Sequence, residues 1–250
     1  MLDLIAYLDR IYYTGPTAST IETLNGLHRA HMLSVPFENL DIGLGRRIVC
    51  EEGAFIEKIV NRRRGGFCYE LNGAFGALLR TLGFQVTLLS ARVPRDDGSH
   101  SPEFDHLALK VDLEEPWLAD VGFGDSFVEP LRLQVDIEQP QDKRNFRIVE
   151  EGGFLHMEMA ESGKGWRRQY SCTLTPRNLE DFAGMCHYHQ TSPESPFTRK
   201  KVCSMATPNG RVTLADRKLI ETHGGVREES VLDSEEQWRA ALKRHFGVVL

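Results

Sequence analysis

The sequence holds few of the cysteines that a disulfide-rich or zinc-binding protein needs. Its 250 residues contain only five cysteines, and no two of them form a C-x-x-C pair. A disulfide framework and a cysteine-rich zinc site are therefore not expected, because both use closely spaced thiols. The opening stretch MLDLIAYLDRIYYTG carries Asp3 and Asp9 and lacks a long apolar run, so we expect neither a signal peptide nor a membrane span. The chain is predicted to be a reduced, cytoplasmic protein with free thiols.

An excess of positive charge is also missing. The 30 Lys and Arg residues are outnumbered by 36 Asp and Glu residues, for a formal net charge of −6. This balance argues against a nucleic-acid binder that relies on a broad basic surface. No internal repeat or low-complexity segment appears, and the apolar fraction of 41% is that of an ordinary globular protein. We predict small-molecule partners, with neither nucleic acid nor a membrane among them.

Helical periodicity dominates the first third of the chain. Apolar residues recur at three- and four-residue steps over residues 2–12, 20–32 and 54–62. His28 and His31 lie three apart on the second of these segments, and with no third metal ligand in sight we interpret them as ordinary surface or groove histidines. The basic triplet 62–64 is expected to pair with at least one acid, and Glu38 is the candidate.

The most regular stripe of all surrounds Cys68. After Gly65 and Gly66, the apolar residues of this stripe are spaced as on one face of a helix that ends at Gly83: Phe67, Leu71, Phe75, Leu78 and Leu82. Cys68 falls in the first turn, where free N–H groups and the helix dipole favour an anion, so a lowered thiol pKa is expected if His or Arg is near. A buried cysteine acting as a small apolar residue would explain the position equally well.

From residue 85 onward the pattern changes to short runs rich in β-formers. Six of them, with turns between, predict an antiparallel sheet or barrel of about six strands: 84–91, 106–111, 117–121, 146–149, 155–159 and 166–173. The C-terminal part is expected to contain a helix over 178–185, a hairpin formed by 201–207 and 210–214, and a last helix over 234–246 with Ser234 and Gln237 as a capping box. The fold class is therefore α+β.

A histidine and an aspartate are expected to meet across one hairpin of this sheet. A cysteine nucleophile needs a base, and the base needs an acceptor that orients it. If the hairpin pairs Val111 with Glu115, His106 and Asp120 sit directly opposite each other, with Cβ atoms about 4.5–5.5 Å apart. A slip of one residue would place them on opposite faces. Together with Cys68, the pair points to thiol nucleophilic catalysis.

At this point the residues resemble the arylamine N-acetyltransferase family. Five stretches carry the resemblance, in chain order: LHRAHMLSVPFENLDI (27–42), RRGGFCYELN (63–72), FDHLALKV (104–111), LADVGFGDSF (118–127) and HQTSPESPFT (189–198). The resemblance implies an N-terminal helical bundle with the nucleophile over 1–84, a central antiparallel β-barrel with the base and acid over 85–188, and a C-terminal α/β lid over 189–250. Beyond about residue 198 the likeness is weaker, so it implies no particular acceptor.

The resemblance also assigns roles to residues. It implies a catalytic triad of Cys68, His106 and Asp120, acetylated by acetyl-CoA as a cosubstrate, with no tightly bound cofactor and no metal. Arylamines, arylhydrazines or arylhydroxylamines would accept the acetyl group by a ping-pong mechanism, in a monomer or weak homo-oligomer. The remaining assignments are an acceptor pocket of Phe37, Tyr69, Phe123 and Phe197, a CoA-entry segment of Gly122, Gly124 and Ser126, and a supporting charge pair of Glu38 and Arg64.

Other functions fit parts of this pattern. An amide synthase of the same architecture would load a larger acyl chain on Cys68. A cysteine protease or transglutaminase uses the same Cys–His–Asp order along the chain, and a binding protein could keep the scaffold without activity. Metal chemistry through Cys186, His187 and His189 would need His187 and His189 to alternate in an extended segment, and the family-like TSPESPF stretch explains this region better.

Overall fold

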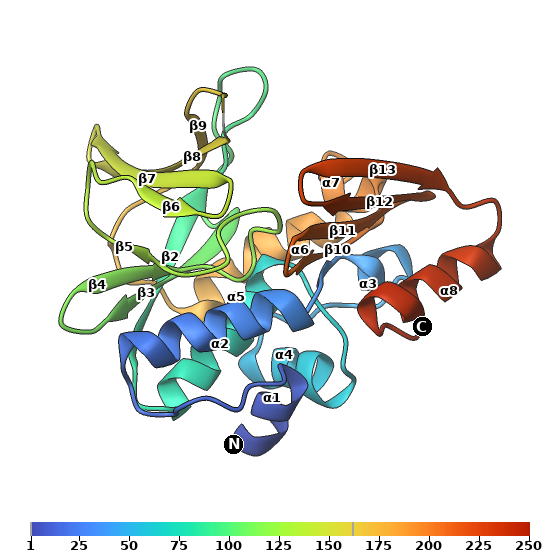
Figure 1. Cartoon of the computed structure of the whole chain (residues 1–250), viewed down its shortest axis with the longest axis horizontal. Coiled ribbons are helices and arrows are strands. Elements are labelled where there is room, and N and C mark those ends of the chain that lie inside the picture. The colour runs from blue at the N-terminus through green and yellow to red at the C-terminus, as the bar shows by residue number, and fades with distance from the viewer. Residues whose placement is uncertain (1, 162) are drawn as a thin grey trace.

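The computed structural model describes residues 2–161 and 163–250 and has an α+β architecture. Figure 1 shows the N-terminal helices below two sheets, one formed by the middle of the chain and one by its C-terminal part. The helical segments in chain order are α1 (Leu4–Arg10), α2 (Ile21–Ser34), α3 (Leu40–Gly43), α4 (Glu52–Ile56), the π-helical turn η1 (Glu57–Asn61), α5 (Cys68–Thr81), the 3-10 turn η2 (Leu179–Phe182), α6 (Ala183–Thr191), α7 (Pro196–Arg199) and α8 (Glu235–Phe246). Among the described residues, no helix combines the length and the apolar character needed to cross a membrane.

The first sheet is antiparallel, with strand order β5-β4-β3-β2-β9-β8-β7-β6. Its strands are β2 (Gln85–Arg92), β3 (His106–Asp112), β4 (Pro116–Ala119), β5 (Leu131–Arg132), β6 (Gln139–Gln141), β7 (Arg144–Glu151), β8 (Phe154–Glu161) and β9 (Arg167–Cys172). Six of them correspond to the expected runs. The two additional strands, β5 and β6, are only two and three residues long, too short for alternation to reveal them.

The second sheet joins the C-terminal part to a short segment near the N-terminus. Its order is β1-β10-β11-β12-β13, with bounds β1 (Phe37–Glu38), β10 (Val202–Thr207), β11 (Gly210–Ala215), β12 (Lys218–His223) and β13 (Val226–Val231). The expected hairpin is β10–β11. Strands β12 and β13 were not expected. Every residue of β13 is exposed, so no alternation of buried and exposed positions marks that strand. The division of the chain into residues 1–84, 85–188 and 189–250 stays a prediction. Helix α6 crosses the boundary between the second and third of these parts.

Helix α5 lies at the centre of the main core. Its apolar stripe forms one cluster of buried residues with Leu24 and Leu27 of α2 and with Leu107 and Leu109 of β3. Every residue from Cys68 to Leu79 is buried, and each large apolar side chain so placed stabilises the fold by about 1.5–3 kcal/mol. The first turn of α5 therefore has a fixed position relative to the first sheet.

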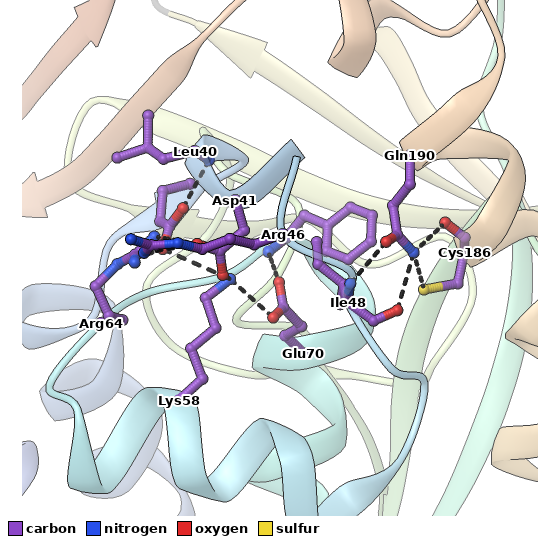
Figure 2. Close-up of polar contacts among 11 residues, drawn as sticks. Leu40, Asp41, Arg46, Ile48, Lys58, Arg64, Glu70, Cys186 and Gln190 are labelled. Carbon is purple, nitrogen blue, oxygen red and sulfur yellow. Dashed lines mark hydrogen bonds and ion pairs between the residues drawn. The ribbon is translucent and has the colours of Figure 1, made fainter. Parts of the chain in front are cut away.

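A cluster of buried charged side chains lies against the first turn of α5 and stabilises it. Lys58 of η1 places Nζ 2.8 Å from Oε1 of Glu70 and 2.9 Å from Oδ2 of Asp41, as Figure 2 shows. Arg64 pairs with Glu38, Nη2 to Oε1, at 2.7 Å. Glu70 also accepts the Phe67 N–H at 3.1 Å, which caps α5. The three carboxylates share two buried cations, and the exposed Arg46 lies 3.7 Å from Asp41 at the edge of the cluster. Burial raises the pKa of Glu70 to about 7 although Lys58 acts in the opposite direction.

Removing Lys58 should destabilise the protein strongly. In a Lys58→Met variant Arg64 is the one buried cation left to the three carboxylates among the described residues of the cluster, and breaking a buried ion pair in this way costs about 3–5 kcal/mol. Urea unfolding followed by circular dichroism measures the loss. Arg62→Met is the matched control, because Arg62 follows the same π-helical turn but pairs with Glu57 in solvent. Equal free energies of unfolding for the two variants would show that the cluster does not hold the helix start.

Candidate active site

Cys68 is the first residue of α5, and its thiol is shielded from solvent. The residue is only 4% exposed, and Sγ lies 4.0 Å from the backbone oxygen of Asp105, just before β3. Gly122 is packed against the same turn, since a Cβ there would lie 2.8 Å from Cα of Cys68. The segment after β4 therefore reaches the helix start only because position 122 has no side chain.

His106 and Asp120 form the buried pair that the sequence analysis expected, but by a different strand register. Nε2 of His106 lies 2.7 Å from Oδ2 of Asp120. Val111 pairs with Trp117 rather than with Glu115, so the predicted register is wrong by two residues. Pro116 opens β4, where its missing N–H removes no ladder bond. Because the register shifts by an even number of residues, His106 and Asp120 still point to the same face of the sheet. Asp120 meets His106 one residue beyond the end of β4.

The electrostatics of the site differ from the expectation for a helix start. Burial alone would lower the pKa of His106, but the Asp120 carboxylate outweighs it and raises this pKa to about 10. Burial raises the pKa of the Cys68 thiol, while the neighbouring His106 acts to lower it. The expected lowering of the thiol pKa by the helix start is therefore wrong, since desolvation of the sulfur outweighs it. With Nε2 bound to Asp120, Nδ1 is the ring nitrogen left to face the sulfur.

Two further side chains that sequence reasoning missed hold Asp120 in place. Asn72 of α5 donates to Oδ1 of Asp120 at 2.8 Å and accepts the Val121 N–H at 2.9 Å. His28 of α2 accepts the Asp120 N–H on Nε2 at 3.1 Å, and its Nδ1 lies 2.8 Å from the oxygen of Val128. The signal for Asn72 was its position one helical turn after Cys68, which places it on the same face.

The interpretation of His28 and His31 as surface or groove histidines is wrong. Both are fully buried, and burial lowers the pKa of His28 to about 4, so this ring is neutral at physiological pH. Its two nitrogens make complementary bonds, one accepting and one donating, as a neutral ring requires. Helical periodicity placed the pair on one face of α2 but could not reveal that this face meets Asp120.

A cavity of about 590 Å³ opens onto Cys68 and His106. Three of the four aromatic residues expected in the acceptor pocket line it, namely Phe37, Phe123 and Phe197. Tyr69 does not: its hydroxyl donates to the Phe104 oxygen at 2.7 Å inside the core. The next residue along a helix points about 100° away, so Tyr69 and Cys68 cannot share this wall.

The glycine-rich segment after Asp120 reaches the same cavity at Gly122 and Phe123. Gly124 and Ser126 are not part of the cavity lining: Gly124, with a φ of +91°, lies beside Phe37, and Ser126 is buried. Two arginines that the sequence analysis did not single out, Arg95 and Arg199, also line the cavity. Within the described residues, no three His, Cys, Asp or Glu side chains gather as a metal site, and His187 and His189 lie on helix α6 rather than in an extended segment.

A thiol, an imidazole and a carboxylate brought together beside a cavity with aromatic and charged walls define an enzyme of the thiol-nucleophile class. A model of the N-acetyltransferase family matches residues 20–250. Arylamine N-acetyltransferase 1 of Homo sapiens is 34% identical over 276 aligned positions, which span 100% of this chain and 95% of the relative. The chain belongs to the arylamine N-acetyltransferase family.

Solved structures of the family agree with the fold. The arylamine N-acetyltransferase from Salmonella typhimurium superposes with a TM-score of 0.93 at 34% identity, covering 98% of this chain and 90% of that one. The Mycobacterium marinum enzyme in complex with CoA superposes with a TM-score of 0.91 at 31% identity, covering 98% of this chain and 93% of that one. Both sheets and the helical part are therefore shared with these proteins.

The pKa of His106 should depend on Asp120. In Asp120→Asn the carboxylate charge is gone, so the pKa of His106 should fall well below its value of about 10. NMR titration of the ring protons measures this, with Asp112→Asn as a control because Asp112, at the other end of β3, pairs with Lys110 and not with His106. A pKa raised on folding stabilises the fold fully below the unfolded value of about 6.5. In the wild type this contribution is lost as pH rises toward 10, and in Asp120→Asn the dependence should shrink. An unchanged pKa of His106 in Asp120→Asn would show that Asp120 does not raise it.

Proposed function

We propose that the chain transfers an acetyl group from acetyl-CoA to an arylamine, arylhydrazine or arylhydroxylamine through an acetyl-Cys68 intermediate. The observation that carries this proposal is the juxtaposition of Cys68, His106 and Asp120 at a cavity walled by aromatic side chains. The CoA complex of the Mycobacterium marinum relative supports the donor. The Salmonella typhimurium relative named as arylamine N-acetyltransferase and N-hydroxyarylamine O-acetyltransferase supports the acceptors.

The first half-reaction acetylates the enzyme. The reacting form is the Cys68 thiolate beside a protonated His106, whose positive charge Asp120 stabilises. The thiolate attacks the thioester carbonyl, a carbon–sulfur bond forms to Cys68, and the bond to the CoA sulfur breaks. Backbone N–H groups at the start of α5 stabilise the oxyanion. His106 gives its proton to the CoA thiolate, which leaves as CoA.

The second half-reaction regenerates the Cys68 thiolate and the protonated His106. The acceptor amine attacks the acetyl carbonyl of acetyl-Cys68, and His106 removes a proton from its nitrogen. The Cys68 thiolate leaves and the amide product departs, so the kinetics are ping-pong. Because the cavity is lined by Phe37, Phe123 and Phe197, a flat aromatic acceptor can stack on or between the rings.

A glycine-rich segment and two arginine side chains are proposed to hold CoA. Gly122, Gly124 and Ser126 would allow the pantetheine arm to approach the backbone. Arg95 and Arg199 line the cavity and are exposed, so they are suited to the CoA phosphates. Glu38 and Arg64 act indirectly, since their pair helps to fix the residues before α5.

The wider setting is part of the same proposal. We expect the enzyme to work in the cytoplasm as a monomer or weak homo-oligomer, without nucleic-acid or membrane partners. Support comes from its free cysteines and its net charge of −6. The division into a helical bundle (1–84), a β-barrel (85–188) and an α/β lid (189–250) is likewise proposed, the last part being the region where acceptor preference is set.

Incubation with acetyl-CoA alone should add one acetyl group to the chain, located on the peptide that contains Cys68. Intact-mass and peptide mass spectrometry measure the adduct. Cys68→Ser should abolish it, whereas Cys172→Ser, which changes a thiol buried in β9, should keep it. An adduct that persists in Cys68→Ser would refute the assignment of the nucleophile. Acetylation without turnover of any arylamine or hydrazine would favour the amide synthase alternative.

Truncating Phe197 should affect the acceptor more than the donor. Its ring packs 6.1 Å from that of Phe37 and 5.1 Å from that of His189, measured between centroids. Phe197→Ala removes one wall of the cavity, so we expect kcat/KM for an arylamine to fall about tenfold, the size of effect that a lost apolar contact gives. Steady-state assays with acetyl-CoA and several arylamines test this, and Phe154→Ala, in the first sheet away from the cavity lining, is the control. A loss confined to the rate of Cys68 acetylation would contradict the placement.

A further inference from the structure

A second cavity, of about 910 Å³, lies outside the active site. It opens between the loop before α4, the start of β2 and helix α6, and none of the residues that line it lines the active-site cavity. Two of the five cysteines, Cys50 from the loop and Cys186 from α6, face it together. Neither takes part in the proposed acetyl transfer.

Gln190 clamps the two segments that carry these thiols. Its side-chain oxygen accepts the Ile48 N–H at 2.7 Å, and its Nε2 donates to the Ile48 oxygen at 3.0 Å. The same Nε2 reaches the oxygen of Cys186 at 2.9 Å and the sulfur at 3.4 Å, as Figure 2 shows. Cys50 follows Ile48 by two residues and Cys186 precedes Gln190 by one helical turn, so the clamp sets the thiols side by side.

The two thiols lie close together and differ in character. The Cys50 thiol lies 3.7 Å from the oxygen of Leu179, which begins the turn leading into α6, and the Cys186 sulfur accepts from Gln190 at 3.4 Å. The proximity of the two thiols lowers the pKa of Cys50, which is half-buried at the cavity, and raises that of Cys186, which is buried. Cys50 is thus the more accessible thiol, which an oxidant meets first, and Cys186 is the neighbour able to resolve the product. Cys172 and Cys203, by contrast, are buried in β9 and β10.

We propose that Cys50 and Cys186 are a redox pair that a hydroperoxide oxidises to a disulfide. The Cys50 thiolate attacks a peroxide oxygen: a sulfur–oxygen bond forms, the oxygen–oxygen bond breaks, and water or an alcohol leaves after taking up a proton. Cys50, oxidised by two electrons, is then a sulfenic acid. The Cys186 sulfur attacks it, the sulfur–sulfur bond forms, and the oxygen leaves as water with the thiol proton.

The surrounding structure allows the bond to close. Residues 46–51 have no helical or strand structure, so no helix or ladder hydrogen bond around Cys50 has to break for a sulfur–sulfur bond of about 2.05 Å to form. The bond would make the contact between this loop and α6 covalent. Helix α6 also carries Tyr188 and His189, which line the active-site cavity, and Nε2 of His189 lies 3.1 Å from Oδ1 of Asp105. Oxidation therefore fixes the helix that forms one wall of the active site.

The test treats the reduced full-length chain with hydrogen peroxide, blocks the remaining thiols with iodoacetamide, and maps non-reduced peptides by mass spectrometry. We expect the Cys50 and Cys186 peptides to appear as one cross-linked species lacking two hydrogens, which dithiothreitol separates. Cys203→Ser, a change at a buried thiol outside the pair, should retain the cross-link. Cys50→Ser should remove it and leave Cys186 as a thiol that iodoacetamide alkylates after denaturation.

Each other result overturns the proposal. Separate alkylation of Cys50 and Cys186 under conditions that oxidise Cys68 would show that they are not a redox pair. Oxidation of Cys50 to sulfinic acid without a cross-link, or a cross-link from Cys50 to another cysteine, would show that Cys186 does not resolve it. The mapping does not use the acetylation reaction, so its outcome is separate from that of the proposed function.

Discussion

The hydrogen bond of 2.7 Å between His106 and Asp120 is the interaction around which the site is arranged, because it requires a charged carboxylate inside the core. Asp120 is fully buried, and an isolated buried carboxylate would take up a proton instead of staying charged. Asn72, His106 and the Gly122 N–H each bond to its oxygens, and together they lower its pKa in spite of burial. Helices α2 and α5, strand β3 and the segment after β4 all contribute to this one environment. Displacing any of these elements would leave a buried charge without a partner.

Much of the fold could be predicted because its elements carry periodic patterns. The stripe of α5 and the six longer strands of the first sheet each show the spacing of one buried face. The rest had no local signal. Strands β5 and β6 are too short, β13 is exposed throughout, and the pairing of β1 with β10 joins residues more than 160 positions apart. Such pairings depend on tertiary packing, which the order of residue types along the chain does not encode locally.

The residues of the site were likewise predictable only in part. Cys68, His106 and Asp120 could be proposed from the chemistry of their side chains and from the face of the sheet to which His106 and Asp120 point. The predicted register was wrong by two residues, but an even shift leaves both side chains on the same face. Tyr69 was assigned to the acceptor pocket but lies in the core, since one step along a helix changes the direction of a side chain. Asn72 and His28 were missed because their importance lies in bonds to Asp120, 48 and 92 positions away. Arg95 and Arg199 lie far apart in the sequence, and only the fold shows that both line one cavity.

Burial of the sulfur, rather than the helix start, determines how the nucleophile must work. A thiol at an exposed helix start would ionise easily but would also leave an acetyl-cysteine open to water. Burial of Cys68 raises the thiol pKa, so ionisation depends on a positive charge that stabilises the thiolate. Asp120 provides that charge by keeping His106 protonated, with its pKa raised to about 10. A shielded thioester and a protonated imidazole thus require each other: the shielding slows hydrolysis of the intermediate, and only the buried carboxylate makes the shielded sulfur reactive. An arrangement with either feature alone would be hydrolysed or inert.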